Sequence, residues 1–417
     1  MESIPHLHHT DPGWLPDSPL ALYVDAYVDH LTRGDYATTT IQEHMRCLAH
    51  LAQWMCQVGC DISELDECAV DHFLNEHLPG CDCPEPVCRN RCDLKATCRH
   101  LLRVLREKGV IAEPTTAGGP IEEELHGFDE YMHRVRGLAE ETRRNRIRIV
   151  RRLLRACFAG QPTMIYTLQP AQVRQFLAKE LERRDSSSHA SALTSALRAY
   201  LRFRRACGDR VDPLLGVIAS PAHWGLASLP RSLSDEEIER LLASFTPDLS
   251  SPLRGYAMVR CALDLGLRVG EIAKLALADI DWQAGTLKLQ RTKSRREDLL
   301  PLPPTTGEAI AAYLRFERPV SINPVVFARH MAPYDVPIGP NAVGKVIGRA
   351  YRRIGLTHGR THALRHALAR HLVESGGSIK EVADVLRHRS LNTSLIYAKL
   401  DTPRLGAVAL PWPGSAT

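Results

Sequence analysis

The sequence predicts a multidomain protein: two all-α N-terminal modules followed by a mainly α catalytic domain with a small antiparallel β-sheet (α+β). The chain has 417 residues, which indicates two or three domains at roughly 150 residues each. Two stretches without helical periodicity, AEPTTAGGPIE and GVIASPAHWGLASLPRS, combine Pro, Gly and small residues and are typical of linkers. The predicted boundaries are therefore residues 1–115, 120–217 and 228–417.

The two modules before the second linker resemble each other weakly. Tyr27 and Tyr131 are separated by the same number of residues as Trp54 and Phe158, and the runs AVDHFLNEHL and QVRQFLAKEL follow. Each copy predicts about four amphipathic helices. Chance similarity among amphipathic helices is the alternative to a true repeat.

Composition narrows the class of protein. With 44% hydrophobic and 24% charged residues, the chain is neither collagen-like, disordered nor a coiled coil. No run approaches the roughly 18 apolar residues of a membrane span. The start MESIPHLHHTDPGWLP lacks the basic and apolar regions of a signal peptide. We expect a cytoplasmic protein with no membrane partner.

The charge pattern favours a polyanionic partner. Net charge is +5, and only 9 of the 53 basic residues are Lys. Guanidinium groups pair bidentately with phosphate, although a GC-rich genome also enriches Arg. One predicted helix of the second module carries a row of arginines opposite an apolar stripe: Arg144, Arg148, Arg151, Arg152 and Arg155. Because no acid lies between Arg143 and Arg155, the row lacks the opposite charges of a self-paired surface and predicts binding to a phosphate backbone.

The third segment changes character. SLSDEEIERLLASF begins with Ser and acidic residues, which indicates a helix N-terminus. TLKLQ alternates apolar and polar residues and DLLPL follows a charged turn, so we expect a β-hairpin with TKSRRE at its tip. Ser378 and Glu381 form a capping box for the helix IKEVADVLRH.

Basic residues and a tyrosine lie at the ends of these elements. Arg268 starts a Gly-flanked helix where backbone amides favour an anion, and Lys293 is on the hairpin turn. The remaining residues are His362 and Arg365, which share a helix face, then His388 and Tyr397. Each one alone has a structural explanation, such as a capping Arg or a core Tyr.

The ordered set resembles the tyrosine recombinase, or phage integrase, family. The matching stretches are GLRVGEI, RTKSRREDLLPLP, HALRHALARHL and VLRHRSLNTSLIY. The resemblance covers Leu233 to Asp401, and more loosely the preceding helical module, which is similar to the family's core DNA-binding domain. It points to a member carried by a transposon or integrative element, with an extra N-terminal helical module. One departure is Arg387, where the family more often has Gly.

The resemblance implies the chemistry of a site-specific integrase or transposase. Tyr397 would attack a DNA phosphodiester to give a covalent 3′-phosphotyrosine and a free 5′-hydroxyl, and Arg268 and Arg365 would clamp the non-bridging oxygens. Lys293 would protonate the departing 5′-oxygen.

Two histidines and one glutamate complete the implied site. His388 would hydrogen-bond the phosphate and His362 would assist proton transfer at Tyr397. Glu271 would support the region around Arg268 rather than react.

The implied cofactors and partners follow from the same resemblance. No metal or ATP is required, and no G-x-x-x-x-G-K-[ST] motif is found in the sequence. The partners would be duplex DNA and other recombinases of the same element. Further copies of the chain would form a tetramer of two dimers on paired sites. The DNA-bound protein would be associated with the bacterial nucleoid. A topoisomerase-like DNA relaxation and a non-cleaving DNA-binding accessory protein stay open as alternatives.

A cysteine cluster lies in the insert of the first module. Cys81, Cys83, Cys88 and Cys92 could bind a structural zinc ion tetrahedrally. Their spacing, C-x-C-x₄-C-x₃-C, is not the paired C-x₂-C pattern of the common zinc sites. Free thiols in a reducing compartment are the alternative.

Overall fold

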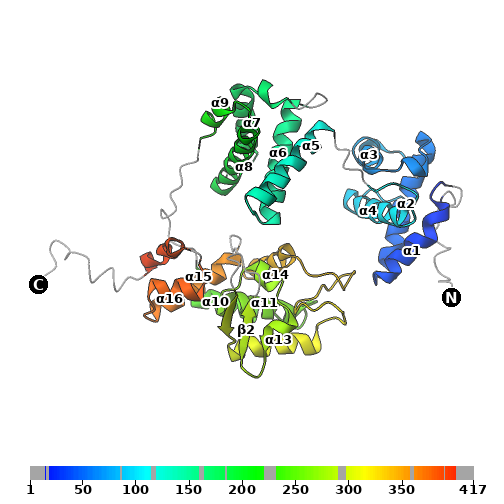
Figure 1. Ribbon diagram of the computed structural model, residues 1–417. Coiled ribbons are helices and arrows are strands. Elements are labelled where there is room, and N and C mark those ends of the chain that lie inside the picture. The colour runs from blue at the N-terminus through cyan, green and yellow to red at the C-terminus, as the bar shows by residue number, and fades with distance from the viewer. Residues whose placement is uncertain are drawn as a thin grey trace, which may run out of the picture. The chain divides into compact units, whose positions relative to one another are not determined.

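The chain is mainly helical, with one small β-sheet. The computed structural model describes residues 15, 18–84, 87–113, 119–158, 164–183, 186–219, 232–289, 297–356, 361–388 and 390–400 (Figure 1). Within these ranges the only sheet has three antiparallel strands, and no helix is long and apolar enough to cross a bilayer. The helical content and the small antiparallel sheet confirm the predicted fold class, whereas two separate N-terminal modules and the domain boundaries stay predictions.

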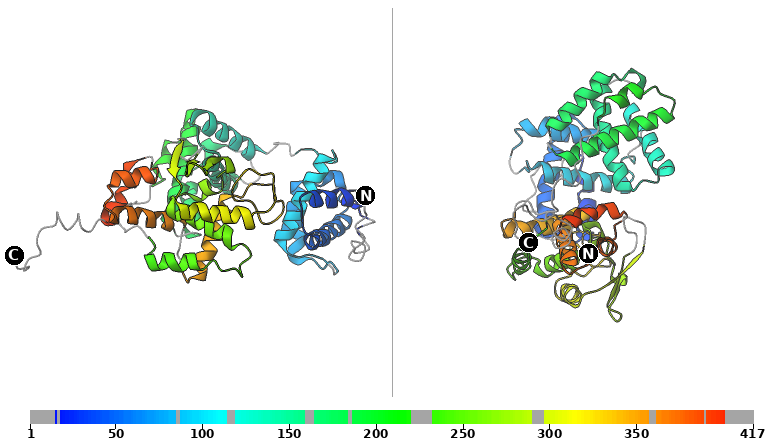
Figure 2. Two further views of the ribbon diagram at one scale, coloured as in Figure 1. Left: turned by 90° about the horizontal axis from the view of Figure 1, so that it is seen from below. Right: turned by 90° about the vertical axis from the view of Figure 1, so that its left-hand side faces the viewer.

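The first group of elements has four α-helices, drawn from blue to cyan in Figures 1 and 2. They are α1 (Val24–Arg33), α2 (Thr38–Val58), α3 (Glu67–His72) and α4 (Arg91–Glu107), with short helical turns η2 (Ala21–Tyr23), η3 (Ile62–Glu64), η4 (Phe73–His77) and η5 (Leu78–Gly80). Helix α2 buries histidines as well as an apolar stripe. Buried polar atoms need partners, and the hydroxyls of Tyr27 and Thr97 both lie 2.8 Å from Nδ1 of His44.

The second group packs around an aromatic core. Its elements are α5 (Pro120–Glu130), η6 (Tyr131–Val135), α6 (Glu140–Phe158), η7 (Ile165–Thr167), α7 (Pro170–Glu182), α8 (Ser187–Ala206) and α9 (Asp212–Gly216). Helix α6 packs against α5 and α8, and the rings of Phe128 and Tyr200 meet edge to face between them. This core fixes which faces of α6 and α8 stay open to solvent.

The third group holds the candidate site. It comprises α10 (Asp235–Ala243), α11 (Pro252–Asp264), α12 (Val269–Ile272), η8 (Leu277–Asp279), β1 (Ile280–Asp281), β2 (Thr286–Leu289), β3 (Asp298–Pro301), α13 (Pro304–Phe316), α14 (Pro340–Arg353), α15 (Thr361–Glu374), α16 (Ile379–Val385), η9 (Leu391–Thr393) and η10 (Leu395–Leu400). Helix α11 is buried along most of its length against α13, α14 and α15. The predicted capping box of Ser378 with Glu381 is present, and Ser234 with Glu237 forms another at the helix start indicated by SLSDEE.

The predicted hairpin is confirmed. Strands β2 and β3 pair antiparallel, with Leu289 opposite Asp298. Leu287 and Leu289 point into the core, while Lys288 between them is exposed, which is the alternation expected of a strand with one covered face. The tip of the hairpin, including Lys293, lies outside the described residues.

Candidate active site

The centre of the site is the hydroxyl of Tyr397, carried on η10. Only 2% of Tyr397 is exposed, because its ring joins a small apolar cluster with Val373 and Val382. The hydroxyl is hydrogen-bonded to Nδ1 of His366 at 2.7 Å. Burial raises the pKa of Tyr397 to about 12, and the charge of Arg365 opposes that rise. The phenol is therefore protonated at neutral pH and has a nitrogen within reach of its proton.

A second histidine stacks on the same ring. The His388 and Tyr397 rings are nearly parallel, 8° apart in orientation, with centroids 6.4 Å apart. Nδ1 of His388 is hydrogen-bonded at 2.6 Å to the buried hydroxyl of Ser394, which fixes the imidazole plane. Burial, reinforced by the nearby arginines, lowers the pKa of His388 to about 4. For His366, burial, with His362 and Arg365 nearby, also lowers the pKa to about 4. Both imidazoles are therefore neutral at physiological pH.

Arg365 is held by two backbone carbonyls. It lies on α15 with 4% of its surface exposed, and its two terminal nitrogens donate to the carbonyl oxygens of Gly266 and Leu386. Burial, together with the charges of Arg268 and Arg387, lowers its pKa to about 9. Two of its five N–H donors are used in this way, and the group still carries its charge at neutral pH.

Glu271 joins two further arginines. Its carboxylate accepts from Nη1 of Arg268 at 2.7 Å and from Nη2 of Arg387 at 3.1 Å. Burial alone would raise the pKa of Glu271, but a hydrogen bond from the Arg268 backbone amide and the charges of Arg387 and Arg268 outweigh it and hold the pKa below its usual value. Glu271 is thus a largely buried anion that holds two guanidinium groups in place.

Arg387 occupies a backbone position that usually favours glycine. Its φ is +52°, in the left-handed region. Its guanidinium also donates to the carbonyls of Leu265 and Gly266, each at 3.3 Å. The departure from the family pattern therefore keeps the left-handed turn before His388 and adds a buried cation to the site.

The structure brings most of the predicted set together. Arg365 interacts electrostatically with Arg268, His388 and Tyr397. His362 lies at the start of α15 with an exposed side chain, and its ring centroid is 6.5 Å from that of His366. In the structure the Tyr397 hydroxyl is thus hydrogen-bonded to His366, which lies one helical turn beyond His362.

Sequence reasoning missed His366, Ser394 and Gly266. His366 follows Arg365 directly and is spaced i, i+4 from His362, so the helical repeat could have placed it on the same face. Ser394 and Gly266 carry no such signal, because their roles come from contacts across the fold.

The arginine row on α6 is paired with acids, so the expectation of an unpaired row is wrong. Arg144 pairs with Glu140 and Glu141 in the first turn of its own helix, Arg151 and Arg155 pair with Glu122 of α5, and Arg152 pairs with Glu180 of α7. Arg148 donates to the side chain of Asn145 at 2.7 Å. Four of the five arginines thus pair with carboxylates from the start of α6 or from neighbouring helices. The sequence argument considered only the acids between Arg143 and Arg155 and therefore missed these partners.

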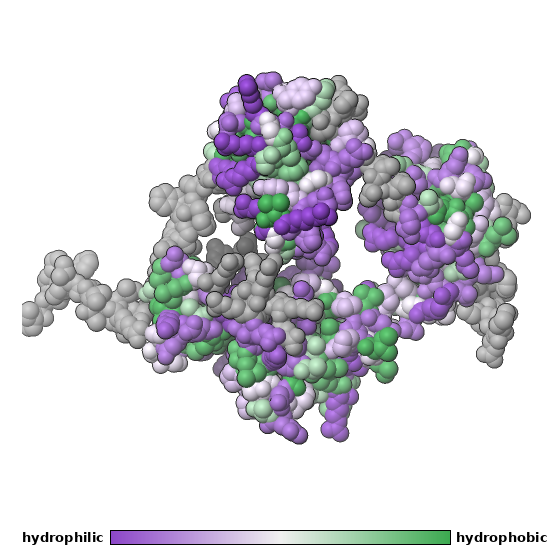
Figure 3. All heavy atoms as spheres, viewed as in Figure 1, coloured by the Kyte–Doolittle hydropathy of each residue, from purple (hydrophilic) through white to green (hydrophobic). Residues whose placement is uncertain are grey.

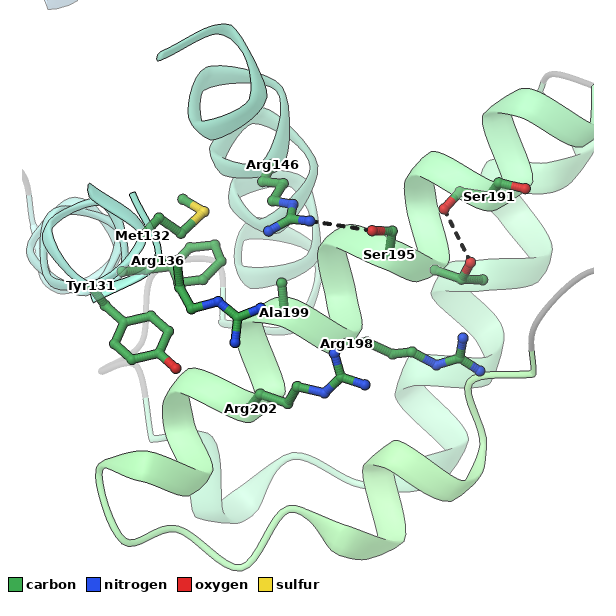
Figure 4. A pocket seen from close by; sticks show the side chains of 11 residues that line it. Tyr131, Met132, Arg136, Arg146, Ser191, Ser195, Arg198, Ala199 and Arg202 are labelled. Carbon is green, nitrogen blue, oxygen red and sulfur yellow. Dashed lines mark hydrogen bonds between the residues drawn. The ribbon is translucent and has the colours of Figure 1, made fainter. Parts of the chain in front are cut away.

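A different arginine cluster lines a cavity of about 430 Å³ between η6, α6 and α8 (Figure 4). Four of its eleven lining residues are arginines, Arg136, Arg146, Arg198 and Arg202, and none is acidic. Burial, with the charges of Arg136 and Arg202, lowers the pKa of Arg146 below its usual value. One face of this helical group is largely hydrophilic in Figure 3. The cavity therefore concentrates positive charge that no lining residue neutralises.

The cysteine cluster does not stay together. Cys81 and Cys83 lie with His50 and His77, whereas Cys88 lies with Cys47 and Glu43. Cys92 is exposed on α4. The structure therefore divides the four cysteines of the expected set, and it places two of them with two histidines.

Comparisons with known proteins agree with the motif analysis. The sequence matches the phage integrase family over residues 231–404. It is 32% identical over 407 residues to y4rA, a putative integrase/recombinase of Sinorhizobium fredii, covering 96% of each chain. The tyrosine recombinase XerA of Pyrococcus furiosus is 27% identical over 231 residues, which is 55% of this chain and 76% of that protein.

Two solved structures share the fold. A dimer of λ integrase (residues 75–356) bound to a COC′ core site gives a TM-score of 0.51 at 17% identity and covers 70% of this chain and 99% of that one. The Tn1549 transposon integrase in complex with transposon right end DNA gives 0.51 at 15% identity and covers 68% and 99%. The fold that carries the site is thus shared with these proteins.

Gly266→Ala should destabilise the protein, because Gly266 has a φ of +57° and an added Cβ would lie 3.0 Å from methyl groups of both Leu368 and Leu386. The left-handed backbone alone costs roughly 1–2 kcal/mol for an alanine. Urea unfolding measures the loss. Gly270→Ala is the matched control, because its Cβ meets nothing within 4 Å. Equal stability of the two variants would contradict the role given to Gly266.

Proposed function

The chain belongs to the phage integrase family and is a tyrosine-type site-specific DNA recombinase, a strand transferase, and we propose that Tyr397 is its nucleophile. The observation that carries this proposal is the 2.7 Å hydrogen bond between the buried Tyr397 hydroxyl and His366, beside the guanidinium of Arg365. A phenol with a raised pKa is a poor nucleophile and needs a neighbouring acceptor for its proton.

The proposed cleavage step uses His366 as that acceptor. The Tyr397 oxygen attacks phosphorus and its proton passes to Nδ1 of His366, which is neutral because burial lowers its pKa to about 4. The bond from phosphorus to the 5′-oxygen breaks as the phosphotyrosine bond forms. The leaving oxygen takes a proton, for which Lys293 is our candidate.

Arg268 and Arg365 are proposed to bind the non-bridging oxygens of the reacting phosphate. Both are held by protein groups before DNA binds, Arg268 by Glu271 and Arg365 by the carbonyls of Gly266 and Leu386. Donors fixed in advance need little reorganisation when negative charge develops, and one such donor contributes about 3–4 kcal/mol to transition-state stabilisation. We propose that His388, held by Ser394, donates a further hydrogen bond to the phosphate.

No group in this scheme requires a metal ion or ATP, since the phosphotyrosine conserves the energy of the broken bond for rejoining. We propose duplex DNA as substrate and a dimer or tetramer on paired sites as the active assembly. The λ integrase dimer on its core site supports that assembly through the shared fold.

We propose that the second helical group binds the DNA backbone through the arginine cavity of α6 and α8. Arg136, Arg146 and Arg202 contribute charge there without an acidic neighbour in the lining. In the α6 row, by contrast, Arg151 and Arg155 share the carboxylate of Glu122, which offsets part of their positive charge. Of the row on α6, Arg148 stays the best candidate for a phosphate contact.

Tyr397→Phe should abolish covalent attachment to DNA while leaving DNA binding nearly unchanged, because the substitution removes only the nucleophilic oxygen. The substrate is nicked duplex from the DNA that flanks the gene, and adducts are counted on denaturing gels. Tyr351→Phe is the matched control, because Tyr351 is equally buried but lies on α14. An adduct formed by the Tyr397 variant would rule out the assignment.

The same assay separates the alternative functions. If the wild type forms the adduct but does not exchange strands between two duplexes, DNA relaxation is favoured. If the wild type forms no adduct, a non-cleaving accessory protein is favoured.

His366→Ala should slow formation of the adduct by about 10²–10⁴-fold, the usual contribution of a general base, and should leave DNA affinity unchanged. Single-turnover cleavage of the same nicked duplex measures the rate. His362→Ala is the comparison, and we expect a smaller effect because its side chain is exposed and the Tyr397 hydroxyl is hydrogen-bonded to His366. A larger loss in the His362 variant would return the proton transfer to that residue.

Replacing Arg146 and Arg202 together by Gln should reduce the salt dependence of DNA binding, by about 0.9 in the log–log slope for each lost B-DNA contact. Replacing Arg151 and Arg155 by Gln is the matched control, because both pair with Glu122. We expect this second pair of changes to lower stability with little effect on the slope. The opposite ranking would restore the α6 row as the main phosphate contact.

A further inference from the structure

Four side chains in the first helical group lie close together and are of the types that bind metal ions. His50 is on α2, His77 ends η4, and Cys81 and Cys83 follow η5. One ligand atom from each lies within 4.8 Å of all the others. His50 and Cys83 are buried, and His77 and Cys81 are partly buried. A set of two imidazoles and two thiols is a known ligand composition for structural zinc.

One separation between ligand atoms already matches a tetrahedral ion. Zn–N bonds of about 2.0–2.1 Å and Zn–S bonds of about 2.3 Å place neighbouring ligand atoms about 3.3–3.8 Å apart. Nε2 of His77 and Sγ of Cys83 are 3.4 Å apart. The rings of His50 and His77 approach edge to face with centroids 5.5 Å apart. The four groups therefore need only small side-chain adjustments to share an ion.

The tautomer of His50 is set by its other nitrogen. Nδ1 of His50 lies 2.7 Å from the carbonyl oxygen of Cys88, which can only accept a hydrogen bond. Nδ1 must therefore carry the proton, and the lone pair is on Nε2. Metal-bound histidines commonly donate in this way from the nitrogen that does not bind the metal, often to a backbone carbonyl, and the bond fixes the ring and its basicity. The Cys88 backbone thus orients His50 for coordination.

We propose that His50, His77, Cys81 and Cys83 bind one structural Zn²⁺ ion. Four protein ligands leave no open position, which is typical of structural rather than catalytic sites. On binding, the two thiols release their protons to solvent and coordinate as thiolates. The ion would tie residues 81–84, which have no regular secondary structure, to the middle of α2.

The neighbouring group of Glu43, Cys47 and Cys88 is a weaker candidate. It supplies three ligands within the described residues, and two of its three ligands are deeply buried thiols. In the proposed arrangement Cys88 acts through its backbone carbonyl and not through its sulfur.

The test uses the full chain purified under reducing conditions, with zinc content measured by elemental analysis. We expect one zinc ion per chain in the wild type and loss of most of it in the variant Cys81→Ser with Cys83→Ser. Cys92→Ser is the matched control, because Cys92 is exposed and lies outside the set, and it should retain the ion. Cys88→Ser should also retain it, because the backbone carbonyl is unchanged.

Cobalt provides a second readout that does not depend on folding yield. The wild-type chain is first stripped of metal with a chelator and then titrated with Co²⁺. It should develop the ligand-field bands of a tetrahedral ion and a thiolate charge-transfer band. The His77→Gln substitution should weaken both signals. Chelation should also lower the melting temperature of the wild type more than that of the double cysteine variant.

Three results would overturn the proposal. The first is a wild-type chain that takes up neither Zn²⁺ nor Co²⁺ after reduction. The second is loss of the ion in Cys88→Ser or Cys92→Ser but not in the double variant, which would place the metal on the other thiols. The third is a disulfide between Cys81 and Cys83, detected because it lowers the mass of the chain by two hydrogens, if the chain still fails to bind zinc after that bond is reduced.

Discussion

The candidate active site depends on one largely buried carboxylate. Glu271 is the acid that holds Arg268 and Arg387, and the charges of both these arginines act on Arg365. Guanidiniums of like charge repel one another, and burial adds a desolvation penalty unless each finds acceptors. Glu271 and the carbonyls of Gly266, Leu265 and Leu386 supply those acceptors. Removing the carboxylate would leave buried cations without compensation.

The backbone is shaped around this requirement. The carbonyl of Gly266 accepts from both Arg365 and Arg387, and it points into the site because the chain turns through a φ of +57° at that glycine. Arg387 itself sits at a φ of +52°. Left-handed backbone at a non-glycine residue costs roughly 1–2 kcal/mol, and hydrogen bonds to a charged group of about 1.5–3 kcal/mol are enough to offset it. Two unusual turns thus serve one electrostatic cluster.

The sequence predicted the helices, the hairpin and the capping boxes well, because periodicity and caps are local signals. Separated motifs in a fixed order also led us to expect one site, and the structure places Arg365 near Arg268, His388 and Tyr397, while Lys293 lies outside the described residues. It did not predict His366 at the Tyr397 hydroxyl or the acids that pair with the α6 arginines. Those depend on which helices pack together, and Glu122 is 29 residues from Arg151 along the chain. The mixed histidine and cysteine set was missed for the same reason, because His50 is distant in sequence from the cysteine insert.

The charge of the site fits the reaction proposed for it. Three guanidiniums face one carboxylate, so the cluster keeps two positive charges, while His366 and His388 stay neutral because burial lowers their pKa values to about 4. A phosphodiester carries one negative charge, and the five-coordinate transition state gains a second as Tyr397 attacks. The two positive charges of the arginine cluster therefore interact more strongly with the doubly charged transition state than with the bound DNA, which is how fixed charges favour a reaction over simple binding. A neutral His366 contributes to the same step, because it can accept the proton of the Tyr397 hydroxyl. The negative charge of the deprotonated oxygen then passes to the phosphate as the new bond to phosphorus forms.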